Sequence, residues 1–179
     1  MNRPFLLIVS AIIIFVSGCG YTTRSLLPTE FKSIHVDNFK NEIKITAEQS
    51  NERMYVGYRP GMEIELTRAV IDKFLMDGNL KIAAGPDANL LLYGTLIDFR
   101  REALRYDAND NVEEYRVKIT VDIELVEAKT GKVVWTDNGF TGETTYRTGG
   151  ALAKSESAGV KEAISDLARR IVERTIEAW

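Results

Sequence analysis

The chain has 179 residues, with 23 lysines and arginines against 26 aspartates and glutamates, and a formal net charge of −3. This balance is not basic enough to indicate a nucleic-acid partner, and the length fits one domain of ordinary size. The single cysteine excludes a disulfide within the chain, and the single histidine leaves no His/Cys cluster for a metal. We therefore expect no cofactor.

The N-terminus has the features of a secretory signal. Arg3 precedes an almost wholly apolar run from Phe5 to Val16, which ends in Ser17-Gly18-Cys19. A basic start, a short apolar stretch and small residues before the cut are typical of a cleaved signal peptide. An aliphatic residue, two small residues and Cys also resemble a bacterial lipobox. The alternative is an uncleaved transmembrane helix, which needs about 20 apolar residues, more than this run offers.

We expect cleavage after residue 18 and a diacylglycerol on the sulfur of Cys19. This group and an N-acyl chain would anchor the protein stably, because two lipid signals suffice. Residues 19–31, which contain Pro28, would form the acylated tether. Gly20, rather than Asp, follows the cysteine, which favours the outer membrane over retention in the inner one. Residues 32–179 would then form a single domain facing the periplasm.

The first half of this domain predicts one clear helix between strands. Residues 32–39 alternate around Ile34 and Val36 and predict a half-buried strand. The polar stretch 41–60 predicts a loop or a weak edge segment. Apolar spacings of three and four predict a helix from Met62 to Met76, ended by Gly78. There follow a short strand at 80–83, a turn at 85–87 and a strand at 88–99, apolar on both faces and so placed in a sheet interior or beneath a helix.

The second half alternates most regularly. A hairpin loop is predicted at 107–111. From Tyr115 to Leu125 every second residue is apolar and those between are charged or polar, which predicts an antiparallel strand with one wet face. A turn at 129–131 leads to strand segments 132–135 and 140–146, separated by a break at 137–139. An apolar stripe then predicts a helix over 155–177 with Ser155 as its N-cap.

These elements together predict an α+β fold. The expected architecture is a two-layer sandwich, with two helices packed on a mixed, mostly antiparallel sheet of about four strands.

The sequence offers no convincing catalytic constellation. His35 lies on a predicted strand without a predicted partner, where a solvated histidine is the commoner outcome. Asp107, Asp110 and Asn111 lack the Gly and the distant Glu of a calcium loop, and a plain hairpin turn accounts for them. Gly149-Gly150 lacks the following Lys-Ser or Lys-Thr of a phosphate loop. We therefore expect that the protein is not an enzyme, and a periplasmic hydrolase is the disfavoured alternative.

Basic residues gather on two segments that are expected to pair as a hairpin: Arg100, Arg101, Arg105, Arg116 and Lys118. Arginine and lysine suit the recognition of phosphate or carboxylate groups. The other interpretation is an ordinary solvated face, balanced by Glu102, Glu113 and Glu114. Both interpretations stay open at this point.

Several motifs occur in a fixed order: Cys19-Gly20-Tyr21, Leu27-Pro28, the strand Lys32–Phe39, the segment Glu65–Phe74, the segment Ala88–Thr95, and Gly131-Lys132-Val133-Val134-Trp135. This order, closed by an amphipathic helix, resembles the LPS-assembly lipoproteins of the LptE family over essentially the whole mature chain. The resemblance implies an outer-membrane lipoprotein that plugs the LptD β-barrel, assists its assembly and helps lipopolysaccharide reach the cell surface. It also implies two helices on a mixed sheet of about four strands.

The resemblance further implies that basic residues bind lipopolysaccharide, and the candidates are Arg100, Arg101, Arg105 and Lys118. The expected partners are an LptD-type barrel, lipopolysaccharide and the membrane, which is reached through the lipid anchor. A domain inside a barrel lumen meets polar walls, so its outer face should be charged and mixed. The alternative function is a generic outer-membrane lipoprotein adaptor that binds another envelope protein.

Overall fold

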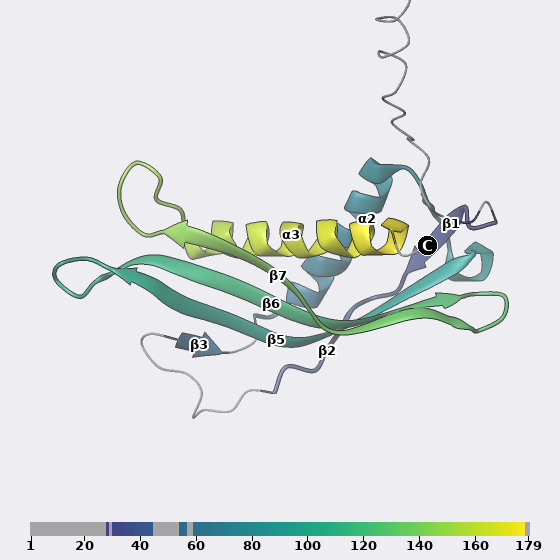
Figure 1. Cartoon of the computed structure of the whole chain (residues 1–179), viewed down its shortest axis with the longest axis horizontal. Coiled ribbons are helices and arrows are strands. Elements are labelled where there is room, and N and C mark those ends of the chain that lie inside the picture. Colours follow the sequence, from purple (N-terminus) through teal and green to yellow (C-terminus); the bar gives the residue numbers. More distant parts are fainter. Residues whose placement is uncertain (1–27, 29, 45–53, 57–58, 178–179) are drawn as a thin grey trace, which may run out of the picture.

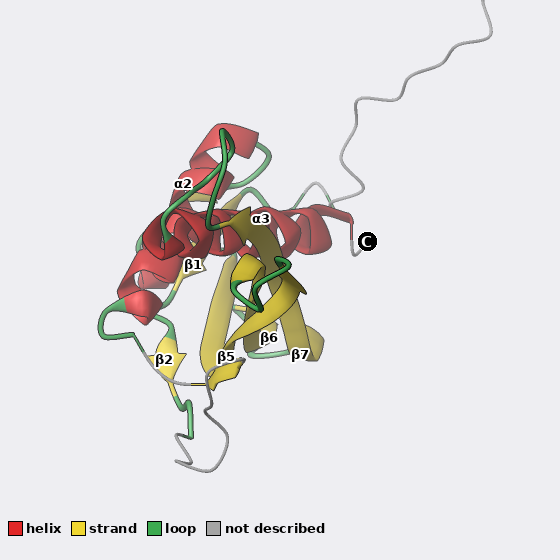
Figure 2. Cartoon of the chain, turned by 90° about the vertical axis from the view of Figure 1, so that its left-hand side faces the viewer, coloured by secondary structure: helices red, strands yellow, loops and turns green. Residues whose placement is uncertain are grey.

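A computed structural model of the chain describes residues 28, 30–44, 54–56 and 59–177. The signal peptide, Cys19 and most of the polar stretch 41–60 lie outside these residues. The described residues form two layers, in which both helices lie on one face of a long, twisted sheet (Figures 1 and 2). No described helix lies on the opposite face, which we call the open face.

The sheet has seven strands in the order β4-β1-β5-β6-β7, with β2 and β3 paired farther along β5. Their bounds are β1 Ser33–Val36, β2 Lys40–Asn41, β3 Met54–Val56, β4 Lys81–Ile82, β5 Leu90–Tyr106, β6 Val112–Glu127 and β7 Val133–Arg147. β5, β6 and β7 are antiparallel neighbours, whereas β1 runs parallel to both β4 and β5. The predicted α+β sandwich is confirmed. The short strand predicted at 80–83 is confirmed as β4. The count of about four strands was too low, in part because β2 and β3 have too few residues to show an alternating pattern.

β5 is longer than the predicted strand 88–99. It continues to Tyr106, so Arg100, Arg101 and Arg105 lie within the strand instead of after it. β5 also lies in the interior of the sheet, between β1 and β6, as its apolar sequence predicted.

β6 confirms the predicted alternation. Its apolar side chains are buried beneath the helical layer: Val117, Ile119, Val121, Ile123 and Leu125. The residues between them therefore belong to the open face.

β7 runs through the predicted break at 137–139 as one strand. Val121 pairs with Phe140 and Ile123 with Asp137, so β7 holds one residue more than β6 between these pairs. Gly139 has a φ of 75°, and its N–H donates to Asp122 Oδ1 at 2.8 Å. This β-bulge accommodates the Asp-Asn-Gly sequence without ending the strand.

Both predicted helices are confirmed, as α2 (Met62–Asp77) and α3 (Glu156–Glu177). Gly78 ends α2 with a left-handed φ of 77°, and its N–H donates to the carbonyl of Phe74 at 3.0 Å. Ser155 Oγ accepts a hydrogen bond from the N–H of Ala158 at 3.2 Å, as expected of an N-cap.

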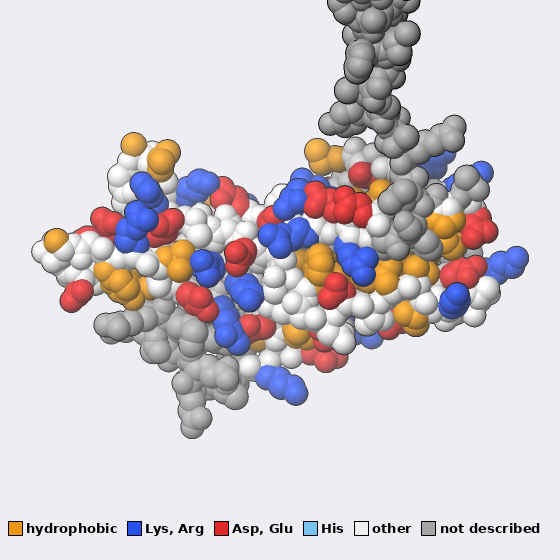
Figure 3. Space-filling view, viewed as in Figure 1, with side chains coloured by type: hydrophobic (Ala, Val, Ile, Leu, Met, Phe, Trp, Pro, Cys, Tyr) orange, Lys and Arg blue, Asp and Glu red, His pale blue; other side chains and the backbone are white. Residues whose placement is uncertain are grey.

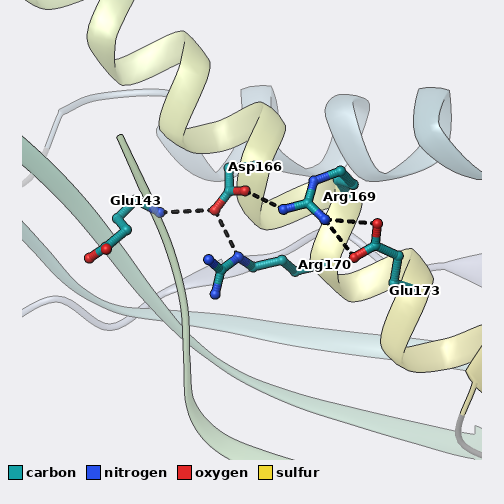
Figure 4. Close-up of polar contacts among 5 residues, drawn as sticks. All are labelled: Glu143, Asp166, Arg169, Arg170 and Glu173. Carbon is teal, nitrogen blue, oxygen red and sulfur yellow. Dashed lines mark hydrogen bonds and ion pairs between the residues drawn. The ribbon is translucent and has the colours of Figure 1, made fainter. Parts of the chain in front are cut away.

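A polar network fastens α3 to β7 (Figure 4). Asp166 Oδ2 accepts a hydrogen bond from the Glu143 backbone N–H at 3.2 Å and forms an ion pair with Arg170, whose Nε lies 2.9 Å away. Asp166 Oδ1 accepts from Arg169 Nη2 at 2.6 Å, and Arg169 also binds Glu173. Burial by itself would raise the pKa of Asp166, but the hydrogen bonds from Arg169 and from the Glu143 N–H outweigh burial and lower that pKa.

We expect Asp166→Asn to lower the free energy of unfolding by about 1 kcal/mol at pH 7. Because the pKa of Asp166 is lower in the folded state, its stabilising effect is complete above the unfolded value near 3.9 and is lost as the pH falls through the folded value. Urea unfolding of both proteins from pH 7 to pH 3 measures the difference, which should shrink in acid. Asp72→Asn, on the exposed surface of α2, is the matched control, and a difference independent of pH would contradict the assignment.

Candidate functional site

The candidate basic residues are arranged by strand pairing, and the predicted pairing of their two segments as a hairpin is confirmed. Three rows cross β5, β6 and β7 on the open face, toward the β5–β6 hairpin: Arg100–Lys118–Glu143, Glu102–Arg116–Thr145 and Arg105–Glu114–Arg147. Side chains that lie opposite each other on neighbouring strands have Cβ atoms about 5 Å apart. The rows therefore bring cations from three strands together.

The open face is divided by charge. The three rows near the hairpin hold five cations and three anions. The next rows along the strands hold Asp98, Asp122 and Glu124 and contain no lysine or arginine among the paired residues. We call the half near the hairpin the basic half. Its excess of cations favours an anionic ligand there over the opposite half.

The ion pairs in the basic half leave its cations accessible. Arg100 Nε lies 2.6 Å from Asp98 Oδ2, and Arg105 Nη2 lies 3.7 Å from Glu114 Oε2. The two arginine side chains are 45% and 57% exposed. Exposed ion pairs contribute little free energy, so a phosphate can replace the carboxylate at modest cost.

Arg101 is separated from the other candidates. It is paired with Val117, which is buried, so its side chain belongs to the face covered by helices. There Arg101 forms an ion pair with Glu156 in the first turn of α3 and lies over the ring of Tyr115, with its Cζ 4.7 Å from the ring centroid. Burial tends to lower the pKa of Arg101, but the charge of Glu156, its hydrogen bond with Arg101 and the neighbouring Tyr146 and Tyr115 together outweigh burial and raise that pKa. This geometry gives Arg101 a packing role between β5 and α3.

A cavity of about 420 Å³ lies at the tip of the sheet, between the β5–β6 hairpin and residues 148–150. Arg105 and Arg147 both line it, together with Glu114 and Asp107.

Hydrogen bonds from the side chain and backbone N–H of Asn111 and from the Asn109 N–H lower the pKa of Asp107, which lies in the loop between β5 and β6. The predicted hairpin loop is therefore confirmed, with Asp107 holding its backbone.

Arg147 was not among the predicted site residues, although it joins this group. A hairpin that turns at residues 129–131 places residue 147 beside residue 114, once the extra residue near Gly139 is allowed for. The signal was therefore the turn position, from which the pairing of the two strands can be counted.

The other residues considered for chemistry have ordinary surroundings. His35 Nδ1 lies 3.1 Å from the carbonyl oxygen of Ala83, and its ring faces Gly85. Within the described parts of the chain, no group of three or more His, Cys, Asp and Glu residues could hold a metal ion. None of the described helices is both long and apolar enough to cross a membrane.

Comparison with known families identifies the chain. The lipopolysaccharide-assembly family LptE matches residues 31–175, most of the sequence. The chain belongs to the LptE family. No curated protein matches it. Its family membership confirms the predicted resemblance and gives the protein a role in lipopolysaccharide assembly.

Three solved structures are similar to this LptE-family chain, and two of them have TM-scores above 0.5. Protein XCC0632 from Xanthomonas campestris is 13% identical, with a TM-score of 0.52, over 87% of this chain and 90% of that one. The hypothetical protein CT253 from Chlamydia trachomatis is 8% identical, with a TM-score of 0.53, over 83% of this chain and 98% of that one. Rare lipoprotein B from Shewanella oneidensis is 18% identical, with a TM-score of 0.42, over 79% of this chain and 92% of that one. At these identities the first two show the fold alone.

Proposed function

We propose that the chain is an outer-membrane lipoprotein, anchored through lipid on Cys19, that assists assembly of an LptD-type barrel, plugs it and contributes to the transport of lipopolysaccharide to the cell surface. The family match over residues 31–175 carries this proposal. Residues 1–18 would be the signal peptide, 19–31 the tether and 32–179 the periplasmic domain. The role is binding and assembly, without an enzymatic step.

The open face supports the role of a plug. From the row Tyr93–Glu124–Thr136 to the row Arg105–Glu114–Arg147, the paired residues of this face carry charged and hydroxyl side chains, and only the row Leu91–Val126–Val133, at the end away from the β5–β6 hairpin, is apolar among the paired residues. The apolar residues Val117 to Leu125 of β6 lie beneath the helices. Figure 3 shows Lys, Arg, Asp and Glu side chains interspersed over the visible surface. The lumen of a large membrane barrel is polar, so such a surface can lie against its wall without burying uncompensated apolar groups.

Within this function, the basic half of the open face would bind the phosphates of lipopolysaccharide. Arg100, Arg105 and Lys118 are the proposed contacts, and Arg116 lies in the row between them. Arg101 is left out of this set because Glu156 and Tyr115 hold it on the other face.

We expect the double variant Arg100→Ala/Lys118→Ala to bind purified lipopolysaccharide about tenfold more weakly, since each of the two substitutions removes a charge-assisted contact to phosphate. Arg68→Ala/Lys161→Ala removes the same charge from the exposed helical surface and serves as the matched control. Binding isotherms at one salt concentration measure both. Equal weakening in the two variants would mean that only the net charge matters and would contradict a site on the basic half.

The adaptor alternative gives a different result in cells. If the chain is an adaptor for another envelope protein, its depletion should leave the amount of lipopolysaccharide at the cell surface unchanged. If it is a component of the translocon, its depletion should lower that amount. Purification from detergent-solubilised outer membranes provides the second test, because a plug should copurify with an LptD-type barrel.

A further inference from the structure

The last turn of α2 exposes two neighbouring apolar side chains. Leu75 is 62% exposed and Met76 is 79% exposed. The buried stripe of α2 runs through Leu66, Val70 and Phe74, and the two residues that follow lie outside it. Among the other exposed positions of the helix, Ile64 in the first turn is apolar, and the rest carry charges: Glu65, Arg68, Asp72 and Asp77. A solvated helix surface normally carries such charges, so packing within the domain does not explain Leu75 and Met76.

The exposed pair is held rigidly. Phe74 on one side and Leu80 on the other are almost completely buried. The N–H of Gly78 donates to the carbonyl of Phe74 at 3.0 Å, which closes the helix end. Leu75 and Met76 therefore project from a fixed position of the fold.

This helix end lies where the N-terminal segment joins the domain. β4 follows α2 after three residues and pairs with β1, with Lys81 opposite Ser33. The N–H of Lys81 donates to the carbonyl of Lys32 at 3.0 Å, so these two exposed lysines are neighbours. Figure 1 shows a short loop that leads from the end of α2 to the part of the molecule that holds β1, and Figure 3 shows hydrophobic side chains exposed near both ends of the elongated molecule.

We propose that this end of the domain contacts the phospholipid leaflet, an inference that rests on the lipid anchor proposed above. The segment from Cys19 to Lys32 spans at most about 45 Å when extended, so an anchored domain can reach the bilayer surface. Leu75 and Met76 enter the headgroup region, as apolar residues of peripheral proteins do. Lys32 and Lys81 lie beside them, where their ammonium groups meet lipid phosphates and their stems cover apolar surface.

This contact would set the orientation of the domain. β5 has 17 residues and β6 has 16, and at about 3.3 Å per residue these strands are about 50 Å long. The tip cavity with Arg105 and Arg147 lies at their far end. The contact would therefore lie away from the basic tip, toward the other end of these strands (Figure 1).

A fluorophore on an introduced thiol tests the contact in the full, lipidated chain, because the sulfur of Cys19 is already acylated. Met76→Cys and the control Leu152→Cys place the label at opposite ends, at side chains that are 79% and 70% exposed. The chains are reconstituted in phosphatidylethanolamine/phosphatidylglycerol vesicles with spin-labelled lipids. We expect quenching at position 76 to be several-fold stronger than at position 152, and Leu75→Gln to reduce quenching at position 76.

The intact mass of each chain separates the two proposals. A lipidated chain whose label at position 76 is quenched no more than the label at position 152 overturns the membrane contact and leaves the anchor standing. This outcome is also expected if Leu75 and Met76 bind a protein partner instead. A chain without lipid on Cys19 overturns the anchor and, with it, this inference.

Discussion

Gly142→Val should lower the free energy of unfolding by about 3 kcal/mol or more, because α3 lies directly on the backbone of β7 at this residue. A Cβ at Gly142 would lie 2.4 Å from the Cβ of Leu167 and 2.6 Å from its Cα and backbone nitrogen. Leu167 is fully buried in the middle of α3. The helix backbone cannot rotate away as a side chain could, so the whole helix must move off the sheet.

The matched control is Gly149→Val. Gly149 lies near the end of the same strand, and a Cβ there would meet nothing within 4 Å. Urea unfolding followed by circular dichroism gives both free energies, and the control should stay within about 0.5 kcal/mol of the unmodified protein. Similar losses in the two variants would show that added β-branched volume, rather than contact with α3, causes the effect.

The elements predicted best are those whose sequence repeats over many residues. β6 has five buried apolar residues at every second position, and α2 and α3 have long apolar stripes. Their ends were also predictable, because Gly78 and Ser155 have direct physical roles at helix ends. Such patterns identify a strand or helix without knowledge of its neighbours.

The parts missed depend on pairing between strands. Residues 100–106 are rich in arginine and were not predicted to form a strand, yet β6 pairs with them along their length. β2 and β3 exist because β5 lies beside them, and two or three residues carry no pattern of their own. The bulge at Gly139 likewise depends on the carboxylate of Asp122 on the neighbouring strand.

The candidate site was predictable in part. Adjacent residues of a strand point to opposite faces, so the separation of Arg100 from Arg101 follows as soon as both are placed in one strand. The row that joins Arg105 with Arg147 cannot be derived from alternation alone, because β5 has a register shift between Ala103 and Arg105 and β7 has its own bulge. Each irregularity moves the pairing by one residue and decides which charges meet.

We expect Cys19→Ser to abolish retention in the outer membrane, the largest effect on function among these variants. A diacylglycerol and an N-acyl chain bury many methylene groups, at about 0.8 kcal/mol for each one. Serine cannot form the thioether, so the variant should keep its signal peptide or remain without lipid. Fractionation after washing with salt, together with the intact mass, measures the result.

The domain of the Cys19→Ser variant should still fold, since the core cluster of the described residues lies within β1 to α3, with Phe31 packed against it, and does not involve residue 19. Leu75 and Met76 together offer at most a few kcal/mol of apolar burial, which is too little to retain the chain without its acyl groups. The anchor would therefore provide the affinity for the membrane, and the α2 end would provide the orientation. A Cys19→Ser chain whose intact mass showed that the signal peptide had been removed, and that still remained in the outer-membrane fraction, would contradict this division, because the retention would then come from the domain itself.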